Sequence, residues 1–147
     1  MRIAKARIQS ALRDGGALQR FRQLVIAQGG DPAFVDEPER LPRAAHIRQI
    51  VAPQSGFLQR IDAGEIGMAS VELGAGRAKK GDRIDHAVGI VVHHKVGDRV
   101  EAGQPLFTVH ASDPARLELA ARRAHAAHGW SDQPVEPLPL FYTTLGT

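Results

Sequence analysis

A glycine-rich basic loop at 74–81 is the part of this sequence where anion-binding chemistry would be expected first. Its key residues are Gly74, Gly76, Arg77, Lys79, Lys80 and Gly81. Backbone N–H groups of a glycine loop can cradle phosphate, above all at a helix N-terminus. Lys79, however, stands where the dinucleotide fingerprint needs its third glycine, and Asp82 stands where a Walker A loop needs lysine. We therefore favour a helix end followed by a flexible loop over an anion-binding site.

The histidines are the next candidates, since imidazole is a common metal ligand. His93 and His94 are adjacent, so a strand would point them to opposite faces. His125 and His128 are three residues apart on a predicted helix, but no third ligand is evident and the metalloprotease spacing is absent. We expect no metal site and no cofactor.

Serine and carboxylate side chains also have simpler structural interpretations. Ser55 is a turn residue and Ser70 a small packing residue, and neither lies in a nucleophile elbow. The carboxylates are interpreted as helix caps and turn formers; they are Asp62, Glu65, Asp82 and Asp85. None of these groups forms a convincing acid/base constellation.

The bulk composition is that of a mildly basic globular protein. The 147 residues are 43% apolar, which allows a buried core and one or two domains. The 19 Lys and Arg are interspersed with 16 acidic residues, and only 5% of residues are aromatic, so no nucleic-acid partner is expected. No apolar run approaches ~18 residues, so no membrane span is expected. The lack of cysteine fits a reducing compartment, and we expect a cytoplasmic protein.

The N-terminal part predicts a helical hairpin. Apolar spacing indicates helices over 2–14 and 17–28, with glycine pairs at 15–16 and 29–30 as stops. A hairpin of this size cannot bury both apolar stripes on itself, so we expect it to pack on something larger. Three prolines and four acidic residues in 31–42 then indicate a linker.

The remaining sequence predicts a mixture of short strands and two helices. Strands are expected over 46–51, 57–61, 88–94, 99–100 and 106–110. One helix begins after Asp62, with Glu65 completing a capping box, and ends at Gly74. A last helix runs from Pro114 to about residue 128, followed by an extended proline-rich tail. Two glycine-led strand segments around a helical insert suggest a quasi-twofold β sandwich or small barrel.

Taken in order, these residues resemble the C-terminal region of the pyrimidine-nucleoside phosphorylase family, which includes thymidine phosphorylase. The resemblance is nearly colinear over the whole chain. Its earlier motifs are Gly16-Ala17-Leu18, Ala27-Gln28-Gly29-Gly30-Asp31, Leu41-Pro42, Ala52-Pro53 and Ile61-Asp62-Ala63. Its strongest motifs are Leu73-Gly74-Ala75-Gly76-Arg77, Ile84-Asp85, Val88-Gly89, Gly97-Asp98-Arg99-Val100, Gly103-Gln104-Pro105-Leu106 and Val109-His110-Ala111.

The resemblance implies an α+β fold class and a division into three parts. Residues 1–30 would be the helical remnant of a larger central α/β domain. Residues 31–45 would be the proline-rich linker. Residues 46–147 would be the family's C-terminal domain, an α/β hammerhead related to the barrel-sandwich fold of biotinyl and lipoyl domains.

The resemblance also implies a reaction, the attack of phosphate on a pyrimidine nucleoside to give free base and pentose 1-phosphate. The family motifs that hold phosphate and pyrimidine are absent here, so we expect no catalytic and no substrate-binding residue, and an inactive chain. The partners would be the missing N-terminal domains of the same enzyme, and the family is homodimeric. Met1 falls at ordinary mid-chain sequence of the family, which indicates an excised piece, a truncated gene or half of a split gene.

Three alternatives remain open at this stage. The loop carrying Gly74, Gly76, Arg77, Lys79 and Lys80 is a solvated loop in the simpler interpretation, or one that closes over an anionic substrate in the intact enzyme. A carrier module would need a modified lysine at a hairpin tip, and Lys95 does not match. AMP phosphorylase has a similar C-terminal domain. Preference for thymidine or uridine does not follow from this sequence.

Overall fold

The computed structural model of this chain describes residues 2–77 and 79–143. The chain divides into two compact units, Met1–Leu41 and Pro42–Thr147. Among the described residues, no helix combines the length and the apolar composition needed to cross a membrane. A cytoplasmic setting stays a prediction.

The first unit is helical, as the sequence predicts. Its elements are α1 (Arg2–Arg13), α2 (Gly16–Ala27), the short α3 (Ala33–Asp36) and a 3-10 turn, η1 (Pro38–Arg40). The end of α2 lies at the predicted glycine pair, where Gly29 has φ 77° and Gly30 donates its N–H to the carbonyl of Val25 at 2.8 Å. Arg22 Nε contacts both carboxylate oxygens of Asp36 at 3.0 and 3.1 Å, which ties α3 to α2.

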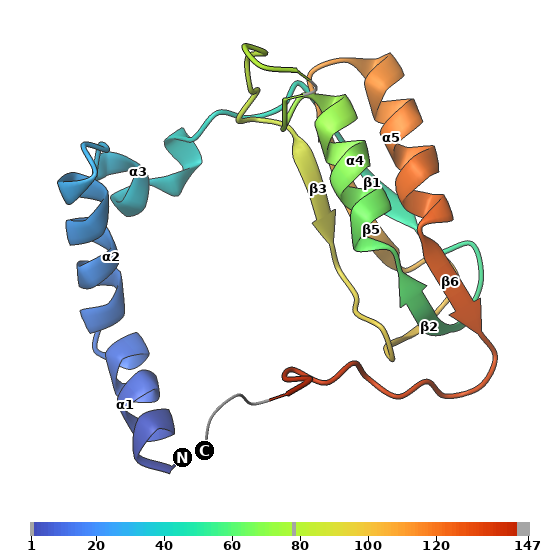
Figure 1. The fold of residues 1–147 in the computed structure, drawn as a ribbon, viewed down its shortest axis with the longest axis horizontal. Coiled ribbons are helices and arrows are strands. Elements are labelled where there is room, and N and C mark those ends of the chain that lie inside the picture. The colour runs from blue at the N-terminus through green and yellow to red at the C-terminus, as the bar shows by residue number, and fades with distance from the viewer. Residues whose placement is uncertain (1, 78, 144–147) are drawn as a thin grey trace. The chain divides into compact units, whose positions relative to one another are not determined.

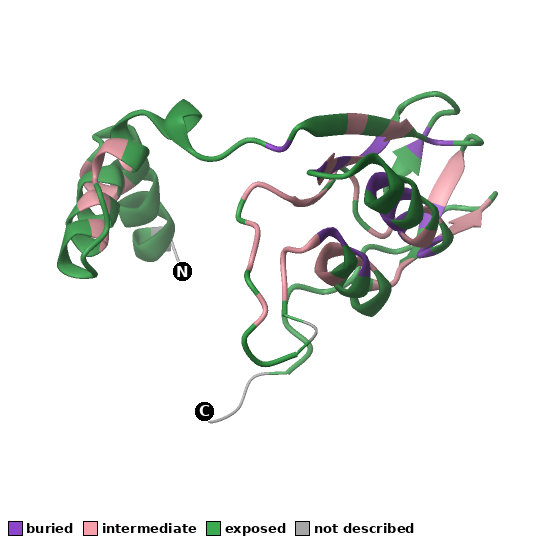
Figure 2. Cartoon of the chain, turned by 90° about the horizontal axis from the view of Figure 1, so that it is seen from above, coloured by how far each residue is buried: buried purple, intermediate pink, exposed green. Residues whose placement is uncertain are grey.

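The apolar stripes of these helices stay largely uncovered within their own unit. Ile8, Leu12, Phe21 and Leu24 are between 52% and 69% exposed. Figure 2 shows the hairpin almost entirely as exposed or intermediate surface. The prediction that the hairpin cannot bury both stripes on itself is therefore confirmed.

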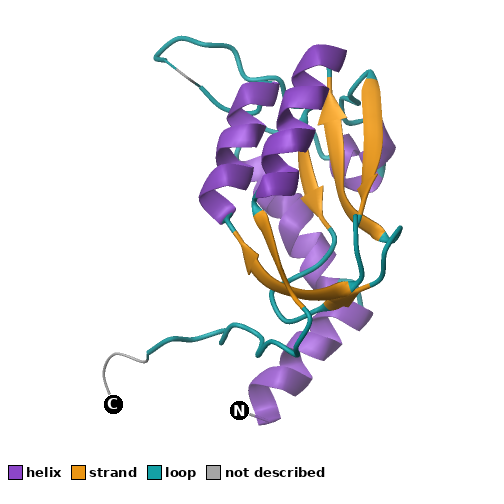
Figure 3. Cartoon of the chain, turned by 90° about the vertical axis from the view of Figure 1, so that its right-hand side faces the viewer, coloured by secondary structure: helices purple, strands orange, loops and turns teal. Residues whose placement is uncertain are grey.

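The second unit is a small α+β domain with two antiparallel sheets (Figures 1 and 3). One sheet has the strand order β1-β5-β3 and the other the order β4-β2-β6. The elements are β1 (His46–Val51), β2 (Gly56–Ile61), α4 (Ala63–Leu73), β3 (Gly89–Val92), β4 (Arg99–Val100), β5 (Pro105–Ala111), α5 (Pro114–Ala126) and β6 (His128–Ser131). The predicted α+β class is confirmed, whereas the hammerhead and barrel-sandwich relationship stays a prediction.

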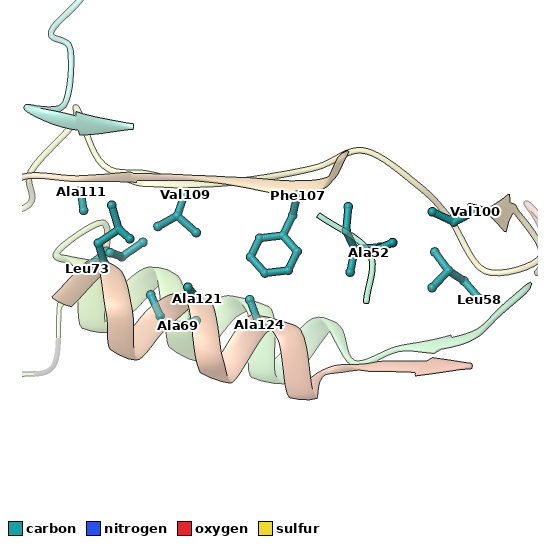
Figure 4. Close-up of a cluster of buried hydrophobic side chains, with 13 residues drawn as sticks. Ala52, Leu58, Ala69, Leu73, Val100, Phe107, Val109, Ala111, Ala121 and Ala124 are labelled. Carbon is teal, nitrogen blue, oxygen red and sulfur yellow. The ribbon is translucent and has the colours of Figure 1, made fainter. Parts of the chain in front are cut away.

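The core lies between the first sheet and the helix pair α4 and α5. Figure 4 shows Phe107 and Val109 of β5 pointing toward the two helices. The side chains of the two helices at this interface are small. Ala69 of α4 and Ala120 and Ala124 of α5 are all fully buried. Small residues at these positions let the helices lie close to the sheet.

At the start of α4 the predicted cap by Asp62 is confirmed, whereas the predicted return contact of Glu65 in a capping box is wrong. Asp62 Oδ1 accepts a hydrogen bond from the N–H of Glu65 at 3.1 Å. The carboxylate of Glu65 does not return to the helix start, as a capping box would require, but accepts from Arg123 Nε at 2.7 Å. Arg123 also pairs with Glu72, so one guanidinium joins the two helices. The cause is the packing of α5 along α4, which no local pattern reveals.

The C-terminal helix ends earlier than predicted, and a strand follows it. α5 ends at Ala126, and β6 pairs antiparallel with β2, with Trp130 opposite Leu58 and His128 opposite Ile61. The sequence pattern instead extended the helix to His128. Long-range pairing with β2 and burial of His128 outweigh the local helical pattern here.

Two strand predictions needed smaller corrections. Strict alternation along the predicted strand 57–61 would put Leu58 and Arg60 on one face. The pairing of β2 is irregular between these residues, however, and Leu58 is fully buried while Arg60 is exposed. β3 ends at Val92, so His93 and His94 lie beyond it. Their Nε2 atoms contact Thr108 Oγ1 at 2.8 Å and the carbonyl of Pro105 at 3.0 Å.

Candidate functional site

The basic loop begins where α4 ends at Gly74. This residue has φ 109°, in the left-handed region that glycine occupies without the strain of a Cβ. Ala75 donates its N–H to the carbonyl of Ser70 at 3.0 Å, and Asp85 donates its N–H to the carbonyl of Gly74 at 2.9 Å. The second of these bonds closes the base of the loop. The role predicted for Gly74, ending the helix, is confirmed.

The interior of the loop is organised around Asp82. Its Oδ2 accepts from the N–H of Lys79 at 3.0 Å, and its carbonyl accepts from Arg77 Nε at 3.3 Å. Gly76 sits against α4 so closely that an added Cβ would lie 2.7 Å from Cγ2 of Val71. The side chains of Arg77, Lys79 and Lys80 are exposed. The result is a cationic surface loop with an ordered base.

A groove of about 760 Å³ lies between this loop, α4 and α5. Its charged lining residues are Glu72, Asp82, Arg83 and Arg116, two acidic and two basic side chains. Their opposite charges balance, so the groove itself does not favour an anion. The exposed cations of the loop can attract an anion by long-range electrostatics, but they do not form a phosphate cradle.

The far end of the loop is fastened by Asp85. Its Oδ2 accepts from Ser112 Oγ at 2.6 Å, and its Oδ1 accepts from the N–H of Ala87 at 2.9 Å. Both bonds favour the ionised carboxylate and lower the pKa of Asp85, the bond from Ser112 most strongly. Sequence reasoning correctly assigned Asp85 to a turn, but it missed the link to Ser112, which is 27 positions away.

The serines considered as nucleophiles both have structural partners. Ser55 Oγ accepts from the N–H of Ala102 at 2.9 Å, joining two turns. Ser70 Oγ donates to the carbonyl of Ile66 at 3.1 Å within α4. Both hydroxyls are therefore bound to backbone groups, which agrees with structural roles for the two serines.

The histidines are dispersed by the fold. His128 is buried in β6, with Nδ1 contacting the carbonyl of Ala124 at 2.7 Å, so His128 does not share a helix face with His125. Within residues 2–77 and 79–143, no group of three His, Asp or Glu side chains is arranged to hold a metal ion.

Comparison with known proteins agrees with the sequence motifs. Residues 57–131 match the family model of the pyrimidine nucleoside phosphorylase C-terminal domain. The pyrimidine-nucleoside phosphorylase of Bacillus subtilis is 46% identical over 119 residues, which are 81% of this chain and 28% of that protein. The thymidine phosphorylase of Mycobacterium tuberculosis is 44% identical over 131 residues, 88% of this chain and 29% of that protein. A pyrimidine-nucleoside phosphorylase of Staphylococcus aureus is 44% identical over 109 residues, 74% of this chain and 25% of that protein.

The two sheets, the covering helix pair and the fastened basic loop define a compact α+β domain. The chain belongs to the family of pyrimidine nucleoside phosphorylase C-terminal domains. It spans between 25% and 29% of the length of these three relatives.

Proposed function

We propose that this chain serves as the C-terminal part of a pyrimidine-nucleoside phosphorylase. The intact enzyme would cleave pyrimidine nucleosides with phosphate to free base and pentose 1-phosphate. This chain would supply a structural and closure domain of the hammerhead type and would be inactive alone. The observation that carries the proposal is the high identity, 44–46%, over most of this chain but a small part of each relative.

The exposed stripes of α1 and α2 support a partner from the rest of such an enzyme. Phe21 and Leu24 are 52% and 55% exposed, although apolar side chains of this size are usually buried in a complete domain. The proposed partner is the preceding α/β domain, whose burial of this stripe would attach the C-terminal part. A homodimeric enzyme is part of the same proposal.

The test is a chimera in which this chain replaces the matching C-terminal segment of the Bacillus subtilis relative. The chimera is expected to release base from thymidine or uridine in a phosphate-dependent reaction, whereas the isolated chain is expected to release none. Turnover by the isolated chain would contradict its proposed inactivity. A folded chimera without turnover would contradict the proposed family function.

For the basic loop, we propose a closing role over an anionic substrate. The residues concerned are Gly74, Gly76, Arg77, Lys79 and Lys80. The support is the combination of a fastened base with three exposed cations between two left-handed glycines, Gly74 and Gly81. Such a loop can move as a unit while its ends stay attached to α4 and Asp85.

Arg77→Ala in the chimera tests the loop. If Arg77 meets the anion on closure, kcat/KM for phosphate falls about tenfold, the equivalent of ~1.4 kcal/mol. Arg43→Ala is the control, because Arg43 is also exposed but lies outside the loop. Equal kinetics of the two variants would leave Arg77 as a solvated residue.

A further inference from the structure

An apolar groove of about 620 Å³ lies at the end of the second unit where β2 leads into α4. Ile61 and Ile66 contribute to its lining from this corner, and Val92 and Val96 contribute from the end of β3 and the turn that follows. The C-terminal tail contributes at 137–140 and 142, and the rest of the lining comes from Ala63, His94, Lys95 and Asp98. The groove is thus shared by two segments far apart in sequence.

The tail approaches the groove in an extended form. Pro134, Pro137 and Pro139 restrict its backbone and exclude a helix. Leu140 and Tyr142 contribute to the groove lining, whereas Phe141 between them does not.

The tail backbone packs closely against Gly97. Gly97 lies in the turn between β3 and β4, and the tail passes this turn (Figure 1). A Cβ on Gly97 would lie 3.0 Å from the nitrogen of Pro137 and 3.1 Å from the carbonyl oxygen of Val135. Backbone atoms cannot give way as a flexible side chain can, so the tail rests here only because the side chain is missing.

Beyond its contact with Gly97, the tail leaves apolar side chains exposed to solvent. Leu140 is 90% exposed and Tyr142 is 78% exposed, although both line an apolar groove. Burying such side chains is favourable, since it removes apolar surface from water. A segment tethered at Pro137 is also present at a high effective concentration, about millimolar, which favours the chain's own tail over a separate occupant.

We propose that residues 137–142 form a strap that closes over this groove, burying Leu140 and Tyr142 against Ile66 and Val92. The strap needs Gly97 as its fixed point. Closure covers apolar surface of the second unit and of the tail at the same time. The proposal concerns the chain itself and is independent of phosphorylase activity.

Nuclear Overhauser contacts in the full chain test closure directly. Tyr142 is the only tyrosine, so its ring signals are unambiguous. Closure predicts contacts from this ring to the methyl groups of Ile66 and Val92 within the same molecule. Absence of these contacts, or contacts only between labelled and unlabelled copies, would overturn the proposal.

Matched variants provide a second test through binding of an apolar dye, anilinonaphthalene sulfonate. Leu140→Ala with Tyr142→Ala is expected to raise the fraction of open groove about tenfold and to increase dye fluorescence. Phe141→Ala is the control, since Phe141 does not line the groove. Equal dye binding by the two variants contradicts the strap.

Gly97→Ala and Gly103→Ala distinguish a steric clash with the tail from the backbone strain of an alanine at positive φ. Both glycines lie in turns with positive φ, at 96° and 84°, but an added Cβ at Gly103 meets no atom within 4 Å. Gly97→Ala is therefore expected to remove the Tyr142 contacts, while Gly103→Ala keeps them. Retention of the contacts in both variants would overturn the role of Gly97.

Discussion

The imidazole of His128 stacks on the ring of Phe107, with ring centroids 5.5 Å apart and planes 10° apart. This pair joins β6 to β5 across the two sheets. His128 Nδ1 contacts the carbonyl of Ala124 at 2.7 Å, whereas its buried Nε2 has no hydrogen-bond partner among the described residues. The geometry suits a neutral imidazole and disfavours a charged one.

The buried imidazole predicts acid sensitivity of folding. Burial lowers the pKa of His128 below its ordinary value of 6.5, and the hydrogen bond to Ala124 only partly offsets this effect. The unfolded chain therefore binds the proton at higher pH than the folded chain. The contribution of His128 to stability is complete above pH 6.5 and declines as the pH falls toward the lowered pKa.

Urea denaturation across this range measures the effect. The slope due to His128 is at most about 1.4 kcal/mol of unfolding free energy per pH unit. His128→Phe keeps an aromatic ring and should remove this part of the pH dependence. His46→Phe, at an exposed position, should keep it. Identical pH profiles of wild type and His128→Phe would contradict the prediction.

Phe107 is expected to be among the most costly side chains to truncate. It is fully buried between the sheet and the helix pair, so Phe107→Ala leaves a cavity and should lower the free energy of unfolding by about 3–5 kcal/mol. Phe141→Ala, at a position 82% exposed, should change it by less than about 0.5 kcal/mol. Chemical denaturation measures the free energy of unfolding of both variants. Similar losses would contradict the central place of Phe107 in the core.

Arg123 is expected to stabilise the contact between α4 and α5. Its side chain is 31% exposed and pairs with both Glu65 and Glu72. Arg123→Met should cost about 1 kcal/mol, because partly exposed ion pairs contribute little individually but here share one guanidinium. Arg122→Met is the control at an exposed neighbouring position. A loss that is equal in both variants would exclude a specific role for the Arg123 pairs.

Asp113 is expected to stabilise the start of α5. Its Oδ1 accepts from the N–H of Arg116 at 2.9 Å, the geometry of a helix N-cap. Asp113→Ala should lower the free energy of unfolding by about 1 kcal/mol, while Asp113→Asn should retain most of the stability. Thermal or urea denaturation distinguishes the two, and an equal loss would mean that charge rather than capping matters.

Local patterns predicted those features whose causes are local. The stop of α2 at Gly29, the Asp62 cap and the end of α4 at Gly74 depend on residues within a turn of each other. The same local view failed for β6 and for Leu58, because a strand partner and a pairing irregularity decided them. Closure by the loop stays a prediction, which the Arg77 variant tests.

The family, the α+β class and most of the element order could be predicted from the sequence, because ordered motifs and helix stops depend on neighbouring residues. Three further contacts became visible only in the folded chain: Asp85 with Ser112, Arg123 between two helices, and the tail against Gly97. Each of these contacts joins residues at least 27 positions apart, so it depends on packing rather than on local pattern. The ordered motifs along the chain were thus sufficient to identify the domain, but the role of each glycine followed from the backbone that surrounds it.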